Sequence, residues 1–215
     1  MGSMCGETRL TGVIPMAIND GWAPDVQADY AVGLYKQFWD ECQVIENDSL
    51  GKEEQVAQIL DYGDVDKIIR IGGKQIHMAQ RFRKPYPDPN TGELVDPDFT
   101  LRYSRPLSDH TIEYQRLMDA YTSRSAAYPR RYSFGRVYDD HERGLYELYI
   151  LDTDELIKQI RSNSIREIGP IKNYQGQEFM AYKLNELRRQ NVIVKEWKHQ
   201  PRPDNPTDIT AWGDD

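Results

Sequence analysis

Cysteine is scarce in this chain, which has only Cys5 and Cys42 among its 215 residues. Two cysteines are too few for a disulfide framework or a zinc-binding set, so the sequence excludes small disulfide-stabilised and zinc-finger classes. Histidine is also rare, with four in all. No apolar run approaches the roughly 18 residues that a membrane-spanning helix needs, so we expect no membrane partner.

The sequence also lacks a signal-peptide core and an excess of basic residues. The first absence predicts a cytoplasmic protein. Its 35 acidic residues outnumber 27 basic ones, giving a net charge of -8. This balance argues against a surface that binds polyanions throughout, although a locally basic face stays open.

What is present is enough for one substantial domain, because 39% of the residues are hydrophobic. The first four residues, MGSM, resemble an expression tag and are left out of the fold prediction. We expect residues 1–26 to be an N-terminal extension and 27–160 to be the core. Residues 161–198 are predicted as a helix and a strand appended to the core, and 199–215 as a loose acidic tail.

Hydrophobic periodicity and turn residues predict a series of helices and strands. The expected helices cover residues 27–45, 52–63, 108–124, 154–162 (capped by Asp152 or Thr153) and 176–190. The expected strands cover residues 65–71, 74–83, 98–106, 131–138, 145–151 and 191–197. This order predicts an α/β fold with a central mixed β-sheet flanked by helices.

The strongest local signal is a hairpin around Gly72-Gly73, because two glycines tolerate the positive φ of a tight turn. On its second strand, side-chain alternation places Arg81 and Arg83 on one face. It places Gln80 and Phe82 on the other, which we interpret as the core face. A carboxylate at Asp66, near the start of the first strand, could hold Mg²⁺, and a cation beside it could steady a phosphate.

These residues resemble a known family. The run Gly63-Asp64-Val65-Asp66-Lys67-Ile68-Ile69, followed by Ala79-Gln80-Arg81-Phe82, is similar to the PD-(D/E)XK, restriction-endonuclease-like superfamily. The order that follows, a helix, a strand, and then a strand plus helix, is also similar, and the resemblance covers roughly residues 27–160. It implies a restriction-endonuclease-like core, DNA as partner and Mg²⁺ as cofactor, with Mn²⁺ as a substitute. Many nucleases of this fold act as dimers, and a homodimer stays open.

The resemblance assigns roles to individual residues. Asp66 matches the metal-binding acid, and Glu54 (or Glu41 or Glu53) could match a helix glutamate that completes the metal site. Arg81 stands in the place of the catalytic lysine. Because an arginine stays protonated, it can clamp a phosphate but does not exchange a proton.

The sequence departs from the family at Ala79, where the pattern has an acid or a glutamine. Gln80 is next to that position, and a β-bulge could rotate it into the site beside Arg81. The other interpretation is that the domain has lost a ligand and only binds.

A second cluster points to nucleic acid. Arg130, Arg131 and Arg136 are interleaved with Tyr128 and Tyr132, and we expect these arginines and Arg83 to contact phosphates. The alternative is a loop with scattered cations. For Asp66 the alternative is a turn cap or a pair with Lys67 or Arg81, and for Arg81 and Arg83 it is a solvated strand face.

Three functions therefore compete. The first is a Mg²⁺-dependent nuclease acting on DNA, and the second is a catalytically inactive protein of the same fold that binds nucleic acid or protein. The third is an acidic interaction protein, such as a viral or mobile-element accessory factor. The net charge of -8, which could mimic or avoid nucleic acid, is the observation behind this hypothesis.

Overall fold

The computed structural model describes residues 24–39, 42–46, 67–88, 91–104, 113–123, 128–137, 145–172 and 176–198. The helices are α1 (Pro24–Phe38), α3 (Glu113–Ser123), α4 (Thr153–Arg161) and α5 (Leu184–Arg189). No helix within the described ranges is both long enough and apolar enough to cross a membrane.

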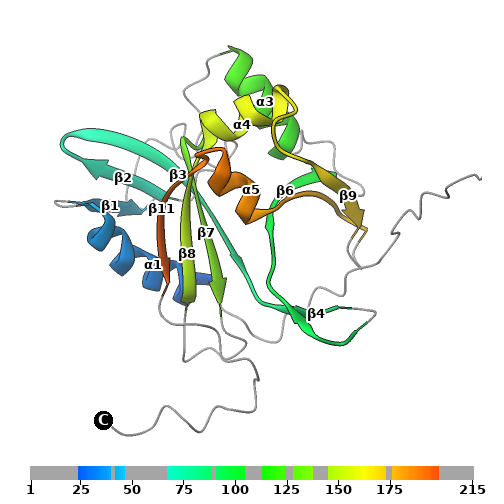
Figure 1. The fold of residues 1–215 in the computed structure, drawn as a ribbon. Helices are drawn as coiled ribbons and strands as arrows, with labels where there is room; N and C mark the ends of the chain where they lie inside the picture. The colour runs from blue at the N-terminus through cyan, green and yellow to red at the C-terminus, as the bar shows by residue number, and fades with distance from the viewer. Residues whose placement is uncertain are drawn as a thin grey trace, which may run out of the picture.

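A large mixed sheet forms the centre of the fold (Figure 1). Its strands, in spatial order, are β1 (Gln43–Glu46), β2 (Lys67–Ile71), β3 (Lys74–Arg83), β7 (Arg131–Val137), β8 (Leu145–Asp152) and β11 (Ile193–Lys198). Strands β3 and β7 run parallel, whereas the other neighbouring strands are antiparallel. The predicted α/β fold with a mixed central sheet is confirmed.

Two smaller sheets are formed by strands that follow β3 in the sequence. One contains β6 (Phe99–Ser104), β10 (Glu178–Tyr182) and β9 (Ile168–Lys172), in that order, and the other pairs β4 (Tyr86–Pro87) with β5 (Leu94–Val95). Because parallel strands cannot be joined by a tight turn, the chain between β3 and β7 crosses over, and β6 and α3 belong to this connection.

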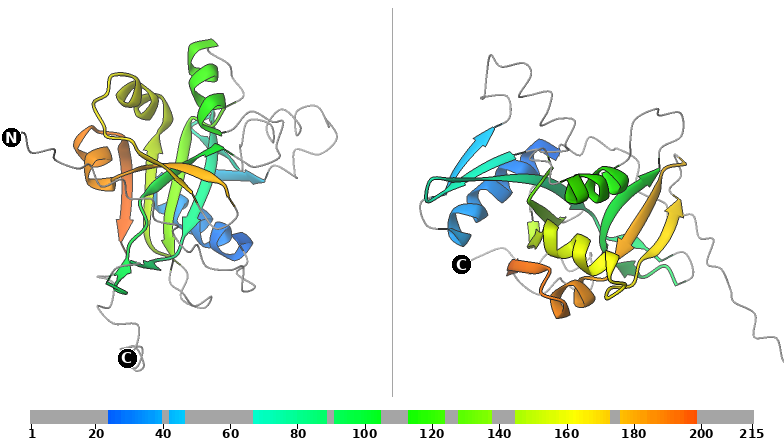
Figure 2. Two further views of the ribbon diagram at one scale, coloured as in Figure 1. Left: turned by 90° about the vertical axis from the view of Figure 1, so that its right-hand side faces the viewer. Right: turned by 90° about the horizontal axis from the view of Figure 1, so that it is seen from above.

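The large sheet is covered on both faces (Figure 2). On one face α1 packs Ala31, Leu34 and Tyr35 against Met78 and Phe82 of β3. On the other face, helices α3, α4 and α5 and the three-stranded sheet enclose a second cluster that includes Ala79, Phe99, Tyr132, Leu156 and Tyr182. Strand β3 is therefore an interior strand whose two faces belong to two hydrophobic cores.

Most predicted elements are confirmed, and two are wrong in part. The helix expected over residues 27–45 ends at Phe38, and residues 43–46 form β1, in which Val44 and Ile45 lie opposite residues of β2. The helix expected over 176–190 splits into β10 and α5. In both places, strand pairing with a distant segment prevails over local helix periodicity. The helix expected over 52–63 lies outside the described residues.

Candidate functional site

The two predicted metal ligands cannot be placed. Asp66 and Glu54 lie outside the described residues, as do the alternatives Glu41 and Glu53. The described part of β2 begins with Lys67, which lies opposite Met78 of β3. Among the described residues, no three His, Cys, Asp or Glu side chains come together in a way that could hold a metal ion. The described residues by themselves therefore do not fit a Mg²⁺ site.

Gln80 faces α1, on the opposite side of β3 from Arg81. Its Nε2 donates a hydrogen bond of 2.8 Å to the hydroxyl of Tyr35, which in turn donates one of 2.6 Å to Oγ of Ser133. The pairing of β3 with β7 is regular from Met78 to Arg83, without the bulge that would rotate Gln80. The structure thus separates Gln80 from Arg81 and gives Gln80 a buried structural contact.

Arg81 points to the other face and forms an ion pair with Glu113, the first residue of α3. Glu113 lies 32 residues after Arg81 in the chain. Its Nη2 lies 2.6 Å from Oε1 of Glu113, and the exposed fractions of the two side chains are 16% and 2%. The guanidinium also lies 5.9 Å from the ring centre of Tyr132. This arrangement corrects the alternative of a solvated strand face for Arg81.

Glu113 is a buried carboxylate with donors on both oxygens. Tyr132 donates its hydroxyl to Oε1 at 2.9 Å, and the backbone N–H of Arg102 donates to Oε2 at 3.0 Å. Burial raises the pKa of Glu113, but the charge of Arg81 and these hydrogen bonds outweigh it, so the pKa lies below its ordinary value. Glu113 is therefore a stable anion at neutral pH.

Arg83 and Arg102 add positive charge to the same region. Burial lowers the pKa of Arg83 to about 10, with Arg81 and Arg102 acting in the same direction and Glu113 against it. Among the described residues no carboxylate forms an ion pair with Arg83, whose Nη1 donates to the carbonyl oxygen of Phe82 at 3.2 Å. We call Arg81, Arg83 and Arg102, whose charges affect one another, the arginine face. Glu113 contacts this group through the side chain of Arg81 and the backbone N–H of Arg102.

Two tyrosines, Tyr103 and Tyr114, form a second network on β6 and α3. Tyr103 of β6 meets Tyr114 of α3 edge-to-face, with ring centres 5.4 Å apart. Burial and a hydrogen bond to Glu167 raise the pKa of Tyr114 to about 12. Glu167 also accepts the hydroxyl of Tyr182 at 2.7 Å. Tyr103 and Tyr114 directly follow Arg102 and Glu113 in the chain, so the two networks share the same two segments.

The other predicted phosphate contacts are paired with carboxylates. Arg130 and Arg131 lie 3.0 Å and 2.8 Å from Asp154 and Asp152, respectively. Arg130 also donates to the hydroxyl of Tyr128, over whose ring it lies. These contacts place both arginines at the start of α4, where they neutralise acids.

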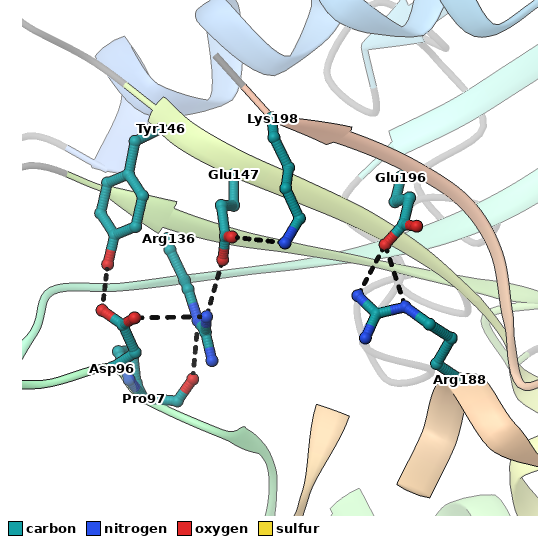
Figure 3. A network of polar contacts seen from close by, with 8 residues as sticks. All are labelled: Asp96, Pro97, Arg136, Tyr146, Glu147, Arg188, Glu196 and Lys198. Atoms are coloured by element: carbon teal, nitrogen blue, oxygen red, sulfur yellow. Dashed lines mark hydrogen bonds and ion pairs between the residues drawn. The ribbon is translucent and has the colours of Figure 1, made fainter. Parts of the chain in front are cut away.

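Arg136 lies inside a polar network at the far end of β7 and β8 (Figure 3). Its Nη1 lies 2.7 Å from Glu147 and 3.6 Å from Asp96, and its Nε donates to the carbonyl oxygen of Pro97 at 3.0 Å. Lys198 of β11 completes the network through Glu147 at 3.1 Å. Arg136 thus anchors the loop before β6 to the large sheet.

Sequence reasoning missed Glu113 and Arg102 as parts of a site, and it grouped Tyr132 with Arg130, Arg131 and Arg136 instead of with Arg81. A signal for Glu113 was present, since a glutamate near a helix start is favoured by the helix dipole. Nothing local links it to Arg81, because the contact depends on how the crossover returns α3 to the sheet. No family model, curated protein or solved structure matches this chain.

Proposed function

We propose that this chain is a nuclease-fold protein that binds DNA phosphodiesters through the arginine face and, with Mg²⁺, hydrolyses them. The element order that the PD-(D/E)XK resemblance implies is consistent with this proposal. The hairpin β2–β3 is followed by α3, then β7, and then β8 with α4. This order supports the fold assignment only, since a fold can host many functions.

The observation that carries the proposal is the charge balance around Glu113. The guanidinium of Arg81 pairs with this buried carboxylate, and the charge of Arg83 is felt by both groups. Helix α3 begins at the carboxylate, so its positive dipole end lies at the same place. A half-buried cation without a carboxylate partner is costly, and an anionic ligand relieves that cost. Arginine is suited to this role, because its planar fork matches two phosphate oxygens.

The acidic charge of the whole chain does not oppose this proposal. The net charge is -8, yet the arginine face is locally positive. Repulsion by distant acidic groups is screened beyond about 8 Å at physiological salt, whereas contacts at the arginine face are direct. We therefore expect binding that is local and sensitive to salt.

A second candidate function is binding without hydrolysis, and the position of Gln80 favours it. The family pattern places an acid or a glutamine beside the catalytic cation, but Gln80 is hydrogen-bonded to Tyr35 on the opposite face. Position 79, on the face of Arg81, is alanine. Under this alternative the arginine face keeps its affinity for phosphate and the chain cuts nothing.

One experiment separates the two candidates. Supercoiled plasmid is incubated with the protein and Mg²⁺ or Mn²⁺, using wild type, Asp66→Ala and Asp119→Ala. Asp119 is an exposed acid of α3 hydrogen-bonded to Gln115, and it controls for loss of one negative charge. Hydrolysis predicts nicking by wild type and Asp119→Ala and none by Asp66→Ala.

The alternative predicts no nicking by any variant and salt-sensitive retention of DNA by all three. If wild type neither cuts DNA nor retains it at low salt, both candidate functions are wrong.

A further inference from the structure

The hairpin formed by β2 and β3 is positively charged in an acidic chain. Residues 67–83 contain five lysines and arginines and no aspartate or glutamate, whereas the whole chain has a net charge of -8. On the neighbouring strand β1, Glu46 lies opposite Lys67 at the base of the hairpin, and Gln43 lies opposite Arg70, closer to the turn. Among the described residues, the turn end of the hairpin therefore has no acidic residue in register with its cations.

This turn end extends past β7 (Figure 1). Strand β7 pairs with β3 only from Met78 onward, so the turn of the hairpin lies beyond the first residue of β7. Arg70, Lys74 and Gln75 are exposed there, and we call these three residues the hairpin tip. No carboxylate of the described chain forms an ion pair with Arg70 or Lys74.

Arg70 and Gln75 of the hairpin tip share a face with Arg83. Arg70 lies directly opposite Gln75, and the pairing of β3 continues to Arg83 without a register shift. Because side chains alternate along a strand, Gln75 and Arg83 lie on one face, and Arg70 joins them there. Ala79, midway between Gln75 and Arg83 on this face, is fully buried. The face thus presents positive charge at two separate places.

The distance between these two places is close to the repeat of duplex DNA. Gln75 and Arg83 are eight residues apart on β3. At a rise of about 3.4 Å per residue this corresponds to about 27 Å, and two arginine side chains extend the reach further. A duplex presents the same side of its backbone again after one helical turn, about 34 Å. A rigid duplex lying along β3 therefore brings phosphates to both places.

From this spacing we propose that the arginine face binds duplex DNA and that the hairpin tip makes a second phosphate contact about one helical turn from Arg83. This inference rests on the proposed function and names the form of its DNA. Arginine and lysine side chains supply the phosphate contacts that fix the position of a duplex. A flexible single strand has no fixed spacing between distant phosphates, so two contacts at a set distance favour the duplex.

The test uses three fluorescent DNA ligands in binding titrations without divalent metal. A long duplex of about 20 base pairs spans both contacts, whereas a short one of about six, closed by an uncharged linker, spans only one. The third ligand is a single strand as long as the long duplex. Wild type is expected to bind the long duplex more tightly than this single strand.

A variant of the hairpin tip then isolates the second contact. On the long duplex, Arg70→Gln/Lys74→Gln should bind about tenfold more weakly than wild type, because a second contact within one complex adds strongly to affinity. Its slope of log affinity against log salt should fall by about 2, one for each cation removed. On the short duplex the same variant should stay within a factor of two of wild type, since Arg83 still offers the one contact that this ligand makes.

The matched control is Lys172→Gln/Lys195→Gln. Lys172 of β9 and Lys195 of β11 are exposed cations outside the hairpin, so this variant loses the same charge elsewhere on the surface. It should bind both duplexes within a factor of two of wild type. Circular dichroism of the two variants checks that their folds are unchanged.

The outcomes are distinguishable. If the tip variant binds the long duplex as the control does, or loses affinity equally for both duplexes, the second contact is wrong. Equal affinity of wild type for the long duplex and the single strand also overturns it, and this comparison requires no variant. In each of these cases salt-sensitive binding by wild type still supports the proposed function, whereas the absence of binding to all three ligands overturns both.

Discussion

Arg81 of β3 and Glu113 of α3 form a 2.6 Å ion pair in which the carboxylate is only 2% exposed. The pair joins the central sheet to the helix that returns from the crossover. Removing one partner of a buried pair leaves the other charge uncompensated, which costs more than the pair itself contributes. Loss of this contact should therefore lower the stability of the fold and also change the position of the Arg81 guanidinium.

We expect Glu113→Ala to lower the free energy of unfolding by about 3–5 kcal/mol. The change leaves Arg81 without its carboxylate, and it removes the acceptor of the Tyr132 hydroxyl and of the Arg102 N–H. The double variant Arg81→Met/Glu113→Leu should be less destabilised than Glu113→Ala, because it leaves no unpaired charge. Urea denaturation of Arg81→Met, Glu113→Leu and the double variant closes a cycle that measures the coupling, and additive effects would contradict it.

Stability should also fall at acid pH because of this carboxylate. The pKa of folded Glu113 lies below its value in the unfolded chain. Its stabilising contribution is therefore fully present above the unfolded pKa, at about 4.3, and is lost as the pH falls through the folded pKa. Glu147, whose pKa is also lowered on balance, acts in the same direction.

We expect urea midpoints of wild type to decline as the pH falls from about 5 to about 3, and Glu113→Gln to show a smaller decline. Gln cannot titrate, so the difference between the two curves isolates this group. Parallel curves would show that Glu113 has the same pKa in the folded and unfolded chains.

A comparison of the elements predicted from the sequence with those in the structure shows which ones depend on adjacent residues and which on distant ones. The hairpin at Gly72-Gly73 and the cap of α4, where Asp152 accepts the N–H of Glu155, depend on adjacent residues and were predicted. The alternation along β3 correctly separated Gln80 from Arg81. Strand β10 was predicted as a helix, because its identity depends on pairing with β6 and β9 rather than on its own residues.

The partner of Arg81 was out of reach for the same reason. Glu113 is 32 positions away, and only the packing of α3 on the sheet brings it close. Sequence reasoning treated Arg81 as solvent-facing because it did not foresee that Glu113 of the crossover pairs with it and leaves only 16% of its side chain exposed.

A buried hydroxyl chain on the α1 side should matter for stability and not for DNA binding. Tyr35→Phe removes the group that accepts from Gln80 and donates to Ser133. We expect a loss of about 1–3 kcal/mol in the free energy of unfolding, because the two buried polar groups lose this partner. DNA affinity at a temperature well below the transition should stay within a factor of two. A selective loss of DNA affinity would place Gln80 in the binding site after all.

Arg83 offers the sharpest separation of binding from stability. We expect Arg83→Gln to weaken binding of DNA about tenfold at low salt, since a hydrogen bond to a charged group is worth about 1.5 kcal/mol or more. The slope of log affinity against log salt should fall by about 1, because one phosphate contact is lost. The matched control is Arg188→Gln, which removes a cation of α5 that lies 2.7 Å from Glu196.

The stability of Arg83→Gln distinguishes a ligand-binding arginine from a structural one. A half-buried cation that has no carboxylate partner among the described residues contributes little to folding, so its removal should leave the free energy of unfolding unchanged or raise it. Arg81→Gln should lower the same quantity, since it breaks the pair with Glu113. If Arg83→Gln loses stability as Arg81→Gln does and keeps the wild-type salt slope, Arg83 supports the fold and the arginine face does not bind phosphate through it.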